Sequence, residues 1–587
     1  MGLGEYINKS KDLVSDSSLK KCKIALLSNF TINGLGEIIK VLCNENRIYA
    51  EIYTPGYNQY AQEILDKSSQ FHKYNPDMVF LLLDAGSFLG EMYDFPYRLD
   101  NTKRKEKIEN KFQELKEIIF FLEQNANAKI VINNFSIPPY SSRGILENKQ
   151  DYGLRDSIKD LNNLLENLAR KDSRLFVFDF NLFIMKQGYD KVRDSKMDYL
   201  ADMKISPNSL VSLAEEYLAY VFPLMSMTKK CIVLDLDNTL WGGIIGEDGI
   251  ANIHLGPEKE GKPFLNFQKK LLELSERGII LAINSKNNFD DAINVLRNHP
   301  YMLLKEDNFA SIRINWNNKL TNIQEIAKEL NIGMDSLVFI DDDKTNREMV
   351  RKMLPEIFVP ELPEDPCDYV KVLETIKFFS SFSITKEDVE KQEMYAAQRK
   401  RNELRSGFSD LESFLKELKI EIGIMKVNNF SIPRASQLSQ KTNQFNLTTR
   451  RYSEEDIKSF LDNKDYILRL VHVKDRFGDY GITGMAVLRK IDAQTVDIDT
   501  FLLSCRILGK DIEFAFLQEL INEAEQHNIQ KITAKFVSTI KNAPAANFLN
   551  EAGFTLKEEY GKEKHYVLDI GKENKKQFYA EIKHVNT

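Results

Sequence analysis

Two aspartates in the segment KCIVLDLDNTLWGG, residues 230–243, have the type and spacing that metal-dependent chemistry needs. Asp235 and Asp237 follow an apolar run that ends at Leu234, and a run without polar alternation predicts a strand buried on both faces. Open α/β sheets bind ligands at the carboxyl ends of such strands. Because neighbouring carboxylates repel each other, a divalent cation is the expected partner. The segment therefore predicts a reaction centre; the alternative is a strand-ending turn, where aspartate is common.

Three further segments end in polar residues that could act on the same ligand. They supply Asn284, Ser285, Lys286 and Asn287 after IILAI, Lys319 after NWNN, and Asp341 and Asp342 after SLVFI. A hydroxyl beside an amine suits a phosphoryl oxygen, and an acidic pair suits a metal ion. Neighbouring strands of a wound parallel sheet would bring these groups to one edge. For Lys286, a solvated surface lysine is an equally good interpretation.

The elements that position these residues are distributed over several domains, because 587 residues are too many for one core. Residues 1–225 alternate apolar strands with amphipathic helices, which predicts a wound parallel sheet, and residues 226–375 repeat that pattern around the aspartates. The charged stretch 376–407 is interpreted as a solvated helical linker. Residues 408–587 mix strands and helices and predict an α+β domain.

Composition excludes several classes of protein. A formal net charge of -7 and a pI near 5.8 argue against a nucleic-acid-binding protein. The sequence has no apolar run of the roughly 18 residues that a membrane span needs, and no signal-peptide h-region near its start. Five scattered cysteines form neither a metal-binding spacing nor a disulfide framework. We expect a cytoplasmic protein.

The ordered set Asp235-x-Asp237-x-Thr239, Ser285, Lys319 and Asp341-Asp342 resembles the four motifs of the haloacid dehalogenase superfamily, subfamily IIIC. The strings VLDLDNTLWGGIIGEDG, NSKNN, NWNNK and FIDDDKTNRE resemble its FkbH-like branch along the full chain. The resemblance implies an α/β protein of three domains: an SGNH-like wound sheet, a haloacid dehalogenase Rossmann-like core with a minimal cap, here a short hairpin flap after Gly243, and a GNAT-like α+β domain.

The resemblance also implies roles for the site residues. Asp235 is the expected nucleophile, and Asp237 is the expected general acid and then base. Ser285 and Lys319 are expected to clamp the phosphoryl oxygens. Mg²⁺ is expected to be held by Asp235, the Asp237 backbone carbonyl, and the pair Asp341 and Asp342, with Asp342 as the direct ligand. The remaining predicted contacts to the substrate or its loop are Asn238, Thr239, Lys286 and Asn287.

The N-terminal domain resembles SGNH hydrolases, whose triad needs a serine and a late Asp-x-x-His. No histidine lies between His72 and His254, so Asp202 in the late segment has no base. A serine nucleophile without its histidine loses most of its rate. We therefore favour a binding or docking module over a hydrolase.

In the third domain, a predicted strand runs into Arg506-x-x-Gly509, which resembles the acetyl-CoA-binding turn of GNAT acyltransferases with one glycine fewer than usual. Backbone N–H groups at a helix start suit pyrophosphate. We expect this turn to hold a phosphopantetheine arm, on CoA or a carrier protein, rather than to catalyse acetyl transfer. Cys505 is the candidate for an acyl-thioester relay, since thiols at helix N-termini are more nucleophilic; a small buried apolar residue is the alternative.

FkbH-like proteins are associated with loading a glyceryl unit from 1,3-bisphosphoglycerate onto an acyl carrier protein, in polyketide or related biosynthesis. A cysteine often precedes their Ser-Lys-Asn motif; here that residue is Asn284, which cannot form a thioester. Either another cysteine carries the acyl group, or the acyl group passes directly to the carrier thiol, or the substrate differs. The alternatives are a phosphatase for a small-molecule or lipid-linked phosphate and a docking platform with a vestigial site, against which the intact acids and Lys319 argue.

Overall fold

The computed structural model describes residues 2–16, 18–385, 388, 394–395, 397, 401, 404–405, 407–408, 410–572 and 578–584. The chain divides into two compact units, Met1–Met225 and Ser226–Thr587. The domain boundaries inside the second unit remain predictions. None of the described helices combines the length and apolar character that crossing a membrane requires.

A five-stranded parallel sheet in the order β2-β1-β3-β4-β5 forms the centre of the first unit. Its strands are β1 (Lys20–Ser28), β2 (Ile48–Tyr53), β3 (Met78–Leu82), β4 (Lys129–Asn133) and β5 (Leu175–Phe178). The longest helices are α2 (Leu35–Glu45), α7 (Asn101–Asn125), α8 (Leu154–Ala169) and α12 (Pro207–Leu224). The shorter ones are α1 (Leu3–Lys11), α3 (Tyr60–Leu65), α4 (Gln70–Tyr74), α5 (Ala85–Leu89), α6 (Glu91–Asp94), α9 (Phe180–Gln187), α10 (Tyr189–Val192) and α11 (Ser195–Ala201).

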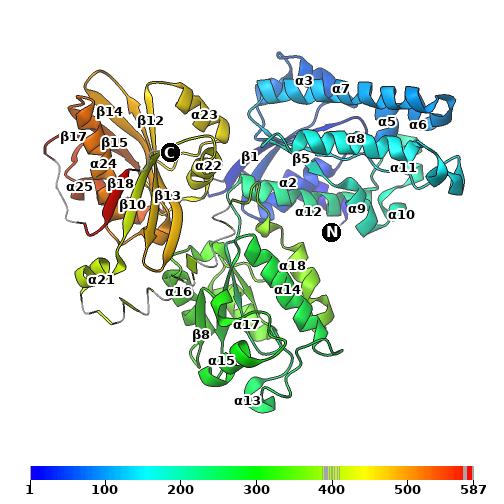
Figure 1. Ribbon diagram of the computed structural model, residues 1–587. Helices are drawn as coiled ribbons and strands as arrows, with labels where there is room; N and C mark the ends of the chain where they lie inside the picture. Colours follow the sequence, from blue (N-terminus) through cyan, green and yellow to red (C-terminus); the bar gives the residue numbers. More distant parts are fainter. Residues whose placement is uncertain are drawn as a thin grey trace. The chain divides into compact units, whose positions relative to one another are not determined.

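Helices cover both faces of this sheet, with α7 and α8 on one side and α2 and α12 on the other (Figure 1). Alternate side chains of a strand point to opposite faces. Accordingly, Val79 and Leu81 of β3 pack in the cluster that contains α7 and α8, whereas Phe80 stacks on Tyr217 of α12 with ring centroids 4.1 Å apart. Burial on both faces explains why these strands are apolar without alternation.

A four-stranded parallel sheet in the order β8-β7-β6-β9 begins the second unit. Its strands are β6 (Cys231–Leu234), β7 (Ile280–Ser285), β8 (Ser311–Ile314) and β9 (Leu337–Ile340). The helices around it, drawn in green in Figure 1, are α14 (Lys262–Glu276), α15 (Phe289–Asn298), α16 (Lys319–Glu329), α17 (Lys344–Met353) and α18 (Tyr369–Thr375). On α16, Ile323, Ile326 and Ala327 recur at helical spacing and join the core with β6 and β9.

The segment after Gly243 is not the hairpin that the sequence predicts. Its only described regular element is the one-turn helix α13 (Ile245–Asp248), and a single antiparallel bridge between Gly242 and His254 closes the loop. The Asp248 carboxylate accepts a hydrogen bond from the Ile244 backbone N–H at 2.8 Å, and this local contact favours the helical turn over an extended arm. The cap is therefore minimal, as expected.

A mixed nine-stranded sheet forms the rest of the second unit. Its strands are β10 (Glu421–Lys426), β11 (Phe445–Asn446), β12 (Tyr466–Asp475), β13 (Gly478–Lys490), β14 (Thr495–Leu503), β15 (Lys531–Val537), β16 (Thr555–Tyr560), β17 (Glu563–Asp569) and β18 (Glu581–His584). The accompanying helices are α21 (Leu411–Leu418), α22 (Ile432–Lys441), α23 (Glu454–Asp462), α24 (Ile512–Gln526) and α25 (Phe548–Glu551). Parallel pairing of β14 with β15 and the antiparallel β12–β13 hairpin make this a mixed sheet within an α+β arrangement.

The prediction of a solvated linker is wrong for the part of residues 376–407 that the structure describes. Tyr395 is buried in the core of the four-stranded sheet, and Arg401 is 1% exposed and forms an ion pair with Asp475. These apolar and paired side chains are spaced too sparsely along a charged sequence to form a recognisable stripe. Most of the predicted connector lies outside the described residues.

Candidate active site

The predicted phosphoryl-transfer residues lie where the strands of the four-stranded sheet end. Asp235 follows β6, Ser285 ends β7, and Asp341 follows β9. All four strands are parallel, so their carboxyl ends share one edge. From β6 the next strands, β7 and β8, are added on one side, and β9 is added on the other side. Open α/β sheets bind ligands at the point where the order of strands changes side in this way.

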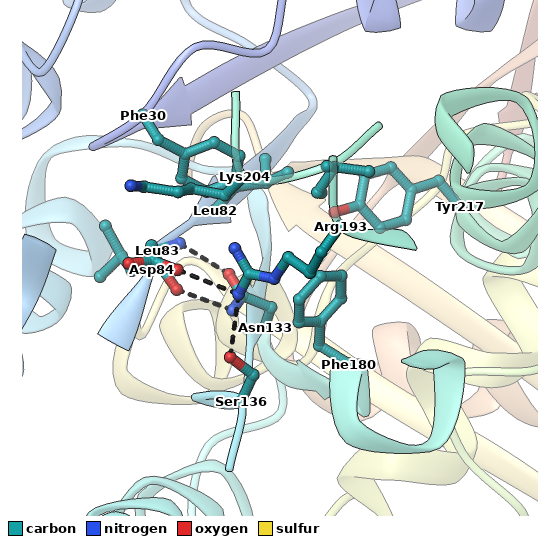
Figure 2. Close-up of a pocket in the computed structure, with 11 residues that line it drawn as sticks. Phe30, Leu82, Leu83, Asp84, Asn133, Ser136, Phe180, Arg193, Lys204 and Tyr217 are labelled. Atoms are coloured by element: carbon teal, nitrogen blue, oxygen red, sulfur yellow. Dashed lines mark hydrogen bonds and ion pairs between the residues drawn. The ribbon is translucent and has the colours of Figure 1, made fainter. Parts of the chain in front are cut away.

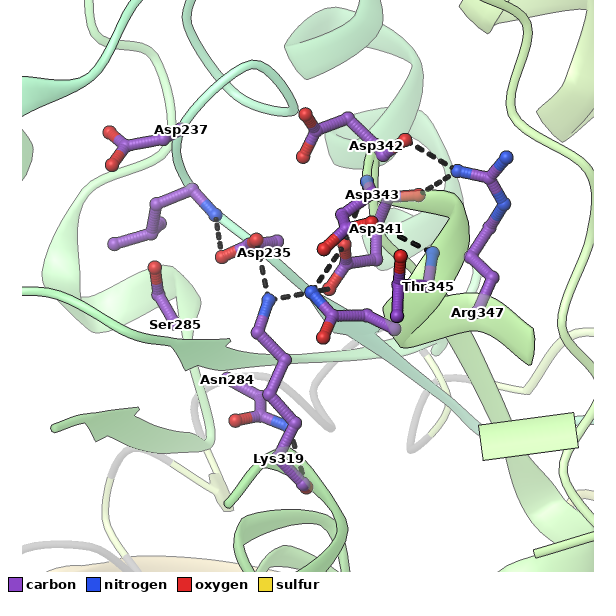
Figure 3. A network of polar contacts seen from close by, with 12 residues as sticks. Asp235, Asp237, Asn284, Ser285, Lys319, Asp341, Asp342, Asp343, Thr345 and Arg347 are labelled. Carbon is purple, nitrogen blue, oxygen red and sulfur yellow. Dashed lines mark hydrogen bonds and ion pairs between the residues drawn. The ribbon is translucent and has the colours of Figure 1, made fainter. Parts of the chain in front are cut away.

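Lys319 joins two of these acids. Its Nζ lies 2.5 Å from Asp235 Oδ2 and 2.5 Å from Asp341 Oδ2 (Figure 3), and the residue is 1% exposed. Burial alone would lower the pKa of Lys319, but the carboxylates of Asp235 and Asp341 outweigh it and raise that pKa above its usual value. The ammonium group therefore stays charged and neutralises part of the acidic cluster.

Asp342 completes a group of carboxylates that fits a divalent cation. Each of the three residues Asp235, Asp341 and Asp342 contributes one carboxylate oxygen, and these oxygens lie within 4.8 Å of one another. Burial raises the pKa of Asp342 to about 6, and the charges of Asp235 and Asp341 add to the shift. Burial and Asp235 also raise the pKa of Asp341, against the pull of Lys319. Three converging oxygen donors that repel one another match the ligand preference of Mg²⁺.

Two residues that sequence reasoning missed hold the acidic pair in place. Arg347 Nη1 donates to the backbone carbonyls of Asp341 and Asp342 at 2.8 and 2.6 Å. Asn346 Nδ2 donates to Asp341 Oδ1 at 3.2 Å. Both lie on the first turns of α17, within the string FIDDDKTNRE. Their role depends on contacts that a sequence pattern does not show.

The carboxylate of Asp237 is turned away from the Lys319 ammonium (Figure 3) and is not one of the three converging acids. Its Oδ1 accepts hydrogen bonds from Trp241 Nε1 at 2.8 Å and the Ile245 N–H at 3.1 Å, while its Oδ2 accepts from Asn287 Nδ2 at 2.9 Å. Trp241 is fully buried, and its sequence position gave no sign of this contact. These donors hold the predicted general acid beside the site.

The loop between β6 and the minimal cap is held by its own residues. Asn238 has a φ of 52°, its Oδ1 accepts from the Gly243 N–H at 2.9 Å, and its carbonyl accepts from Tyr369 Oη at 3.1 Å. Thr239 is fully buried, and its hydroxyl has no hydrogen-bond partner among the described residues. Asn238 is half-buried, and its hydrogen bonds hold the loop to Gly243 and Tyr369.

The polar residues at the end of β7 point in different directions. Ser285 is 1% exposed, its hydroxyl accepts from Asn287 Nδ2 at 3.3 Å, and Lys286 is exposed. Asn284 is fully buried, and its Nδ2 donates to the Lys319 carbonyl at 3.0 Å. Its amide is thus directed to the backbone at the start of α16, below the acids in Figure 3.

The structure does not bring Cys505 to these acids. The Cys505 carbonyl accepts a hydrogen bond from Asn331 Nδ2 at 2.8 Å. Asn331 lies just beyond the end of α16, whereas Lys319 begins it. A helix of 11 residues is about 16 Å long, so Cys505 lies near the opposite end of α16 from the acidic cluster.

The predicted helix start at the Cys505 turn is also wrong. Cys505–Ile507 form a short 3₁₀ turn, and α24 begins only at Ile512 with Asp511 at its N-cap. The Arg506 guanidinium contacts Ser504 Oγ at 3.2 Å and Met394 Sδ at 2.6 Å, and Gly509 precedes the helix with a φ of 74°. Two residues, Lys510 and Asp511, thus separate Gly509 from the start of α24.

Backbone pairing also leaves little room for an extended arm beside β14. Beyond the segment that pairs with β15, β14 pairs with β11 through Phe445 and Asn446. The next residue, Leu447, donates to the Phe501 carbonyl at 3.1 Å and accepts from the Val537 N–H at 2.8 Å. The chain itself fills the gap between β14 and β15. The phosphopantetheine site at the Arg506–Gly509 turn stays a prediction.

The first unit has its own polar cluster at the carboxyl ends of its strands (Figure 2). Arg193 Nη2 lies 3.1 Å from both Asp84 Oδ1 and Ser136 Oγ. Lys204 Nζ pairs with Asp202 at 2.8 Å. The cavity between these residues is about 10 Å³, which is room for one water molecule and not for a substrate. Ser28, which ends β1, is buried, and its hydroxyl accepts a hydrogen bond from the Phe30 N–H.

Comparison with known proteins places these features in context. Residues 23–221 match the family model described as FkbH, N-terminal domain. The solved N-terminal part of the protein BF1531 from Bacteroides fragilis, which contains a phosphatase domain and was complexed with Mg, is 30% identical with a TM-score of 0.59. The match covers 65% of this chain and 100% of that chain.

Two solved acetyltransferases resemble a smaller part of the chain. The ribosomal-protein-S18-alanine N-acetyltransferase from Escherichia coli is 16% identical with a TM-score of 0.21, over 25% of this chain and 94% of that one. A GNAT family acetyltransferase from Elizabethkingia anophelis with acetyl-CoA bound is 15% identical with a TM-score of 0.20, over 26% and 98%. The comparison with curated proteins found no match.

Proposed function

The chain belongs to the FkbH-like family of the haloacid dehalogenase superfamily, and from this premise we propose that it is a Mg²⁺-dependent phosphatase-type enzyme that loads a three-carbon acyl unit onto a carrier protein. The donor is a doubly phosphorylated acid such as 1,3-bisphosphoglycerate, and the acceptor is the phosphopantetheine thiol of an acyl carrier protein. One observation carries the phosphatase part: Asp235, Lys319, Asp341 and Asp342 converge beside Ser285 at one sheet edge.

Asp235 is the nucleophile in this proposal. Its carboxylate oxygen forms a bond to phosphorus while the bond between phosphorus and the leaving oxygen breaks, which gives an aspartyl-phosphate. Lys319 and Ser285 hold the equatorial oxygens, where charge develops in the transition state. Asp235, Asp341 and Asp342 would hold Mg²⁺, which when bound would offset the repulsion between the nucleophile and the phosphate.

Asp237 supplies and then removes the proton. It protonates the leaving oxygen, and it afterwards accepts a proton from the water that attacks phosphorus and releases Asp235. A poor leaving group such as an alkoxide needs that proton, whereas the carboxylate of an acyl phosphate does not. This chemistry therefore suits the phosphate ester of the donor. Its acyl phosphate is left for the carrier thiol, whose sulfur bonds to the acyl carbon as the bond from that carbon to the phosphate oxygen breaks.

The experiment incubates a carrier protein bearing phosphopantetheine with the enzyme, Mg²⁺ and 1,3-bisphosphoglycerate. Mass spectrometry should show the carrier heavier by one glyceryl group, and inorganic phosphate should be released. Phosphate release with no gain in carrier mass would refute loading and leave the second candidate, a phosphatase for a small-molecule or lipid-linked phosphate. Asn284 favours that candidate, because its amide cannot carry an acyl group and is hydrogen-bonded to the Lys319 carbonyl.

A further inference from the structure

Three asparagines lie beneath Lys319 and contact one another. Asn284 is in β7, Asn315 follows β8, and Asn322 is in α16. Asn322 Nδ2 donates to Asn284 Oδ1 and to Asn315 Oδ1, both at 3.0 Å, and Asn315 Nδ2 donates to Asn322 Oδ1 at 3.3 Å. Asn284 Nδ2 donates to the Lys319 carbonyl at 3.0 Å. We call these three residues the asparagine network.

The network ties the start of α16 to two strands. Asn284 and Asn322 are 0% exposed, so each hydrogen bond that is lost leaves a buried polar group unsatisfied, at a cost of about 1–3 kcal/mol. Asn315 is anchored in turn, since its backbone N–H donates to the Ser285 carbonyl at 3.1 Å. The first residue of α16 is therefore fixed relative to β7 and β8.

That residue is Lys319, whose ammonium group must reach carboxylates on two other strands. Its Nζ lies 2.5 Å from Asp235, after β6, and 2.5 Å from Asp341, after β9. A fixed backbone at Lys319 lets the flexible side chain keep both short contacts at once. Misplacing a group at a reaction centre by about 1 Å can reduce the rate about 100-fold.

We propose that Asn284, together with Asn315 and Asn322, positions Lys319 for phosphoryl transfer. The three are positioning residues, because their amides contact the backbone and one another and not the acids. The consequence for catalysis rests on the proposed function, which makes Lys319 a clamp for the phosphoryl group. The consequence for the position of Lys319 stands without it.

The first test measures position. Acetic anhydride labelling with peptide mass spectrometry reports how accessible the Lys319 amine is, which is protected in the folded chain at 1% exposure. Asn284→Ala should raise the rate of Lys319 labelling about tenfold or more, and Asn315→Ala should raise it less. Ser311→Ala is the matched control, because Ser311 is 0% exposed on the neighbouring strand β8 and bonds to Glu329 instead. Equal labelling in Asn284→Ala and Ser311→Ala would overturn the proposal.

The second test measures phosphate release from 3-phosphoglycerate, which carries the same kind of phosphate ester as the proposed donor, at saturating Mg²⁺. Asn284→Ala should lower kcat about 10- to 100-fold and leave KM within about threefold, since a clamp acts in the transition state. When Lys319 is already methionine, adding Asn284→Ala should lower kcat by less than about twofold, because both changes disable the same function, the lysine clamp. Fully multiplicative losses would refute coupling to Lys319.

The two tests separate the inference from the proposed function. Faster labelling of Lys319 without any phosphate release by the wild-type enzyme would support the positioning role and refute the phosphatase chemistry. Normal phosphate release by the wild-type enzyme, with unchanged labelling and unchanged kcat in Asn284→Ala, would support the phosphatase chemistry and refute the positioning role. If Asn284→Ala does not fold, Asn315→Ala decides, because Asn315 is only half-buried and its loss leaves the Asn284–Lys319 contact in place.

Discussion

Replacing Lys319 with methionine should destabilise the domain around the site, because it leaves two buried carboxylates without their cation. Coulomb's law at an effective dielectric constant of about 20 gives roughly 7 kcal/mol for each contact at 2.5 Å, most of which offsets the cost of burying the charges. Removing one partner of a buried ion pair typically costs about 3–5 kcal/mol. With a urea m value of about 2 kcal/mol per molar, Lys319→Met should lower the unfolding midpoint by roughly 2 M.

The chain provides a selective probe for this measurement. Both tryptophans, Trp241 and Trp316, lie between residues 226 and 375, so tryptophan fluorescence follows the unfolding of this part without a signal from the rest. Trp241 is fully buried beside Asp237 and should shift strongly on unfolding. Urea titration at pH 7 without Mg²⁺ is the assay.

Two variants decide the cause. Lys344→Met makes the same change at an exposed lysine at the start of α17 and should leave the midpoint unchanged. Adding Asp341→Asn to Lys319→Met should recover about half of the loss, because it removes one of the uncompensated buried charges. The reasoning is refuted if Lys319→Met unfolds at the same urea concentration as Lys344→Met, or if the second change makes the protein less stable still.

Three further predictions concern the nucleophile, the metal and the first unit. Asp235→Asn should abolish phosphate release while Cys505→Ser leaves it intact, measured with a phosphate assay; activity in the Asp235 variant would contradict the mechanism. Mg²⁺ at 100 times its Kd should stabilise the tryptophan-reported transition by about 2.7 kcal/mol, and Asp342→Asn should remove most of that gain, whereas an equal gain in both would place the cation elsewhere. Burial, with a contribution from Asp172, raises the pKa of Glu123 from 4.5 to about 7, so the folded first unit retains a proton that the unfolded chain releases. The stability from this proton is complete below pH 4.5 and is lost as the pH rises through about 7. Glu123→Gln should therefore flatten the fall of unfolding free energy with pH, measured in the urea transition that circular dichroism follows and tryptophan fluorescence does not. An unchanged pH dependence in this variant would contradict the prediction.

The grouping of the candidate site residues was predictable because they occur in a fixed order at strand ends. An apolar run before Asp235, another before Ser285 and a third before Asp341 predict parallel strands, and parallel neighbours have their carboxyl ends at one edge. Lys319 could be assigned to the same edge because it begins the helix after β8. Local patterns were sufficient for these residues.

Contacts between distant residues could not be predicted in the same way. The sequence shows Asn284 only as a residue that cannot form a thioester, whereas its amide is part of a network with Asn315 and Asn322. Nothing in the spacing of Trp241 indicates that its indole holds Asp237. Tyr395 lies in a charged stretch, and its burial depends on the neighbouring sheet.

The thiol prediction shows where local reasoning fails. The Arg506-x-x-Gly509 pattern was interpreted as a helix start, but α24 begins at Ile512, and the gap beside β14 is filled by β11. The start of a helix depends on capping and packing as well as on the pattern before it. Cys505 is consequently neither at a helix N-terminus nor near the acids.

The sequence by itself determined that Asp235, Asp237, Ser285, Lys319 and the acidic pair belong to one α/β site, because strand periodicity and residue type are local properties. Only the tertiary structure decided how Lys319 is shared between Asp235 and Asp341, and which amides hold it there. Those contacts join residues at the ends of three strands to a helix. A buried charge takes the partners that folding brings within about 3 Å, wherever they lie in the chain.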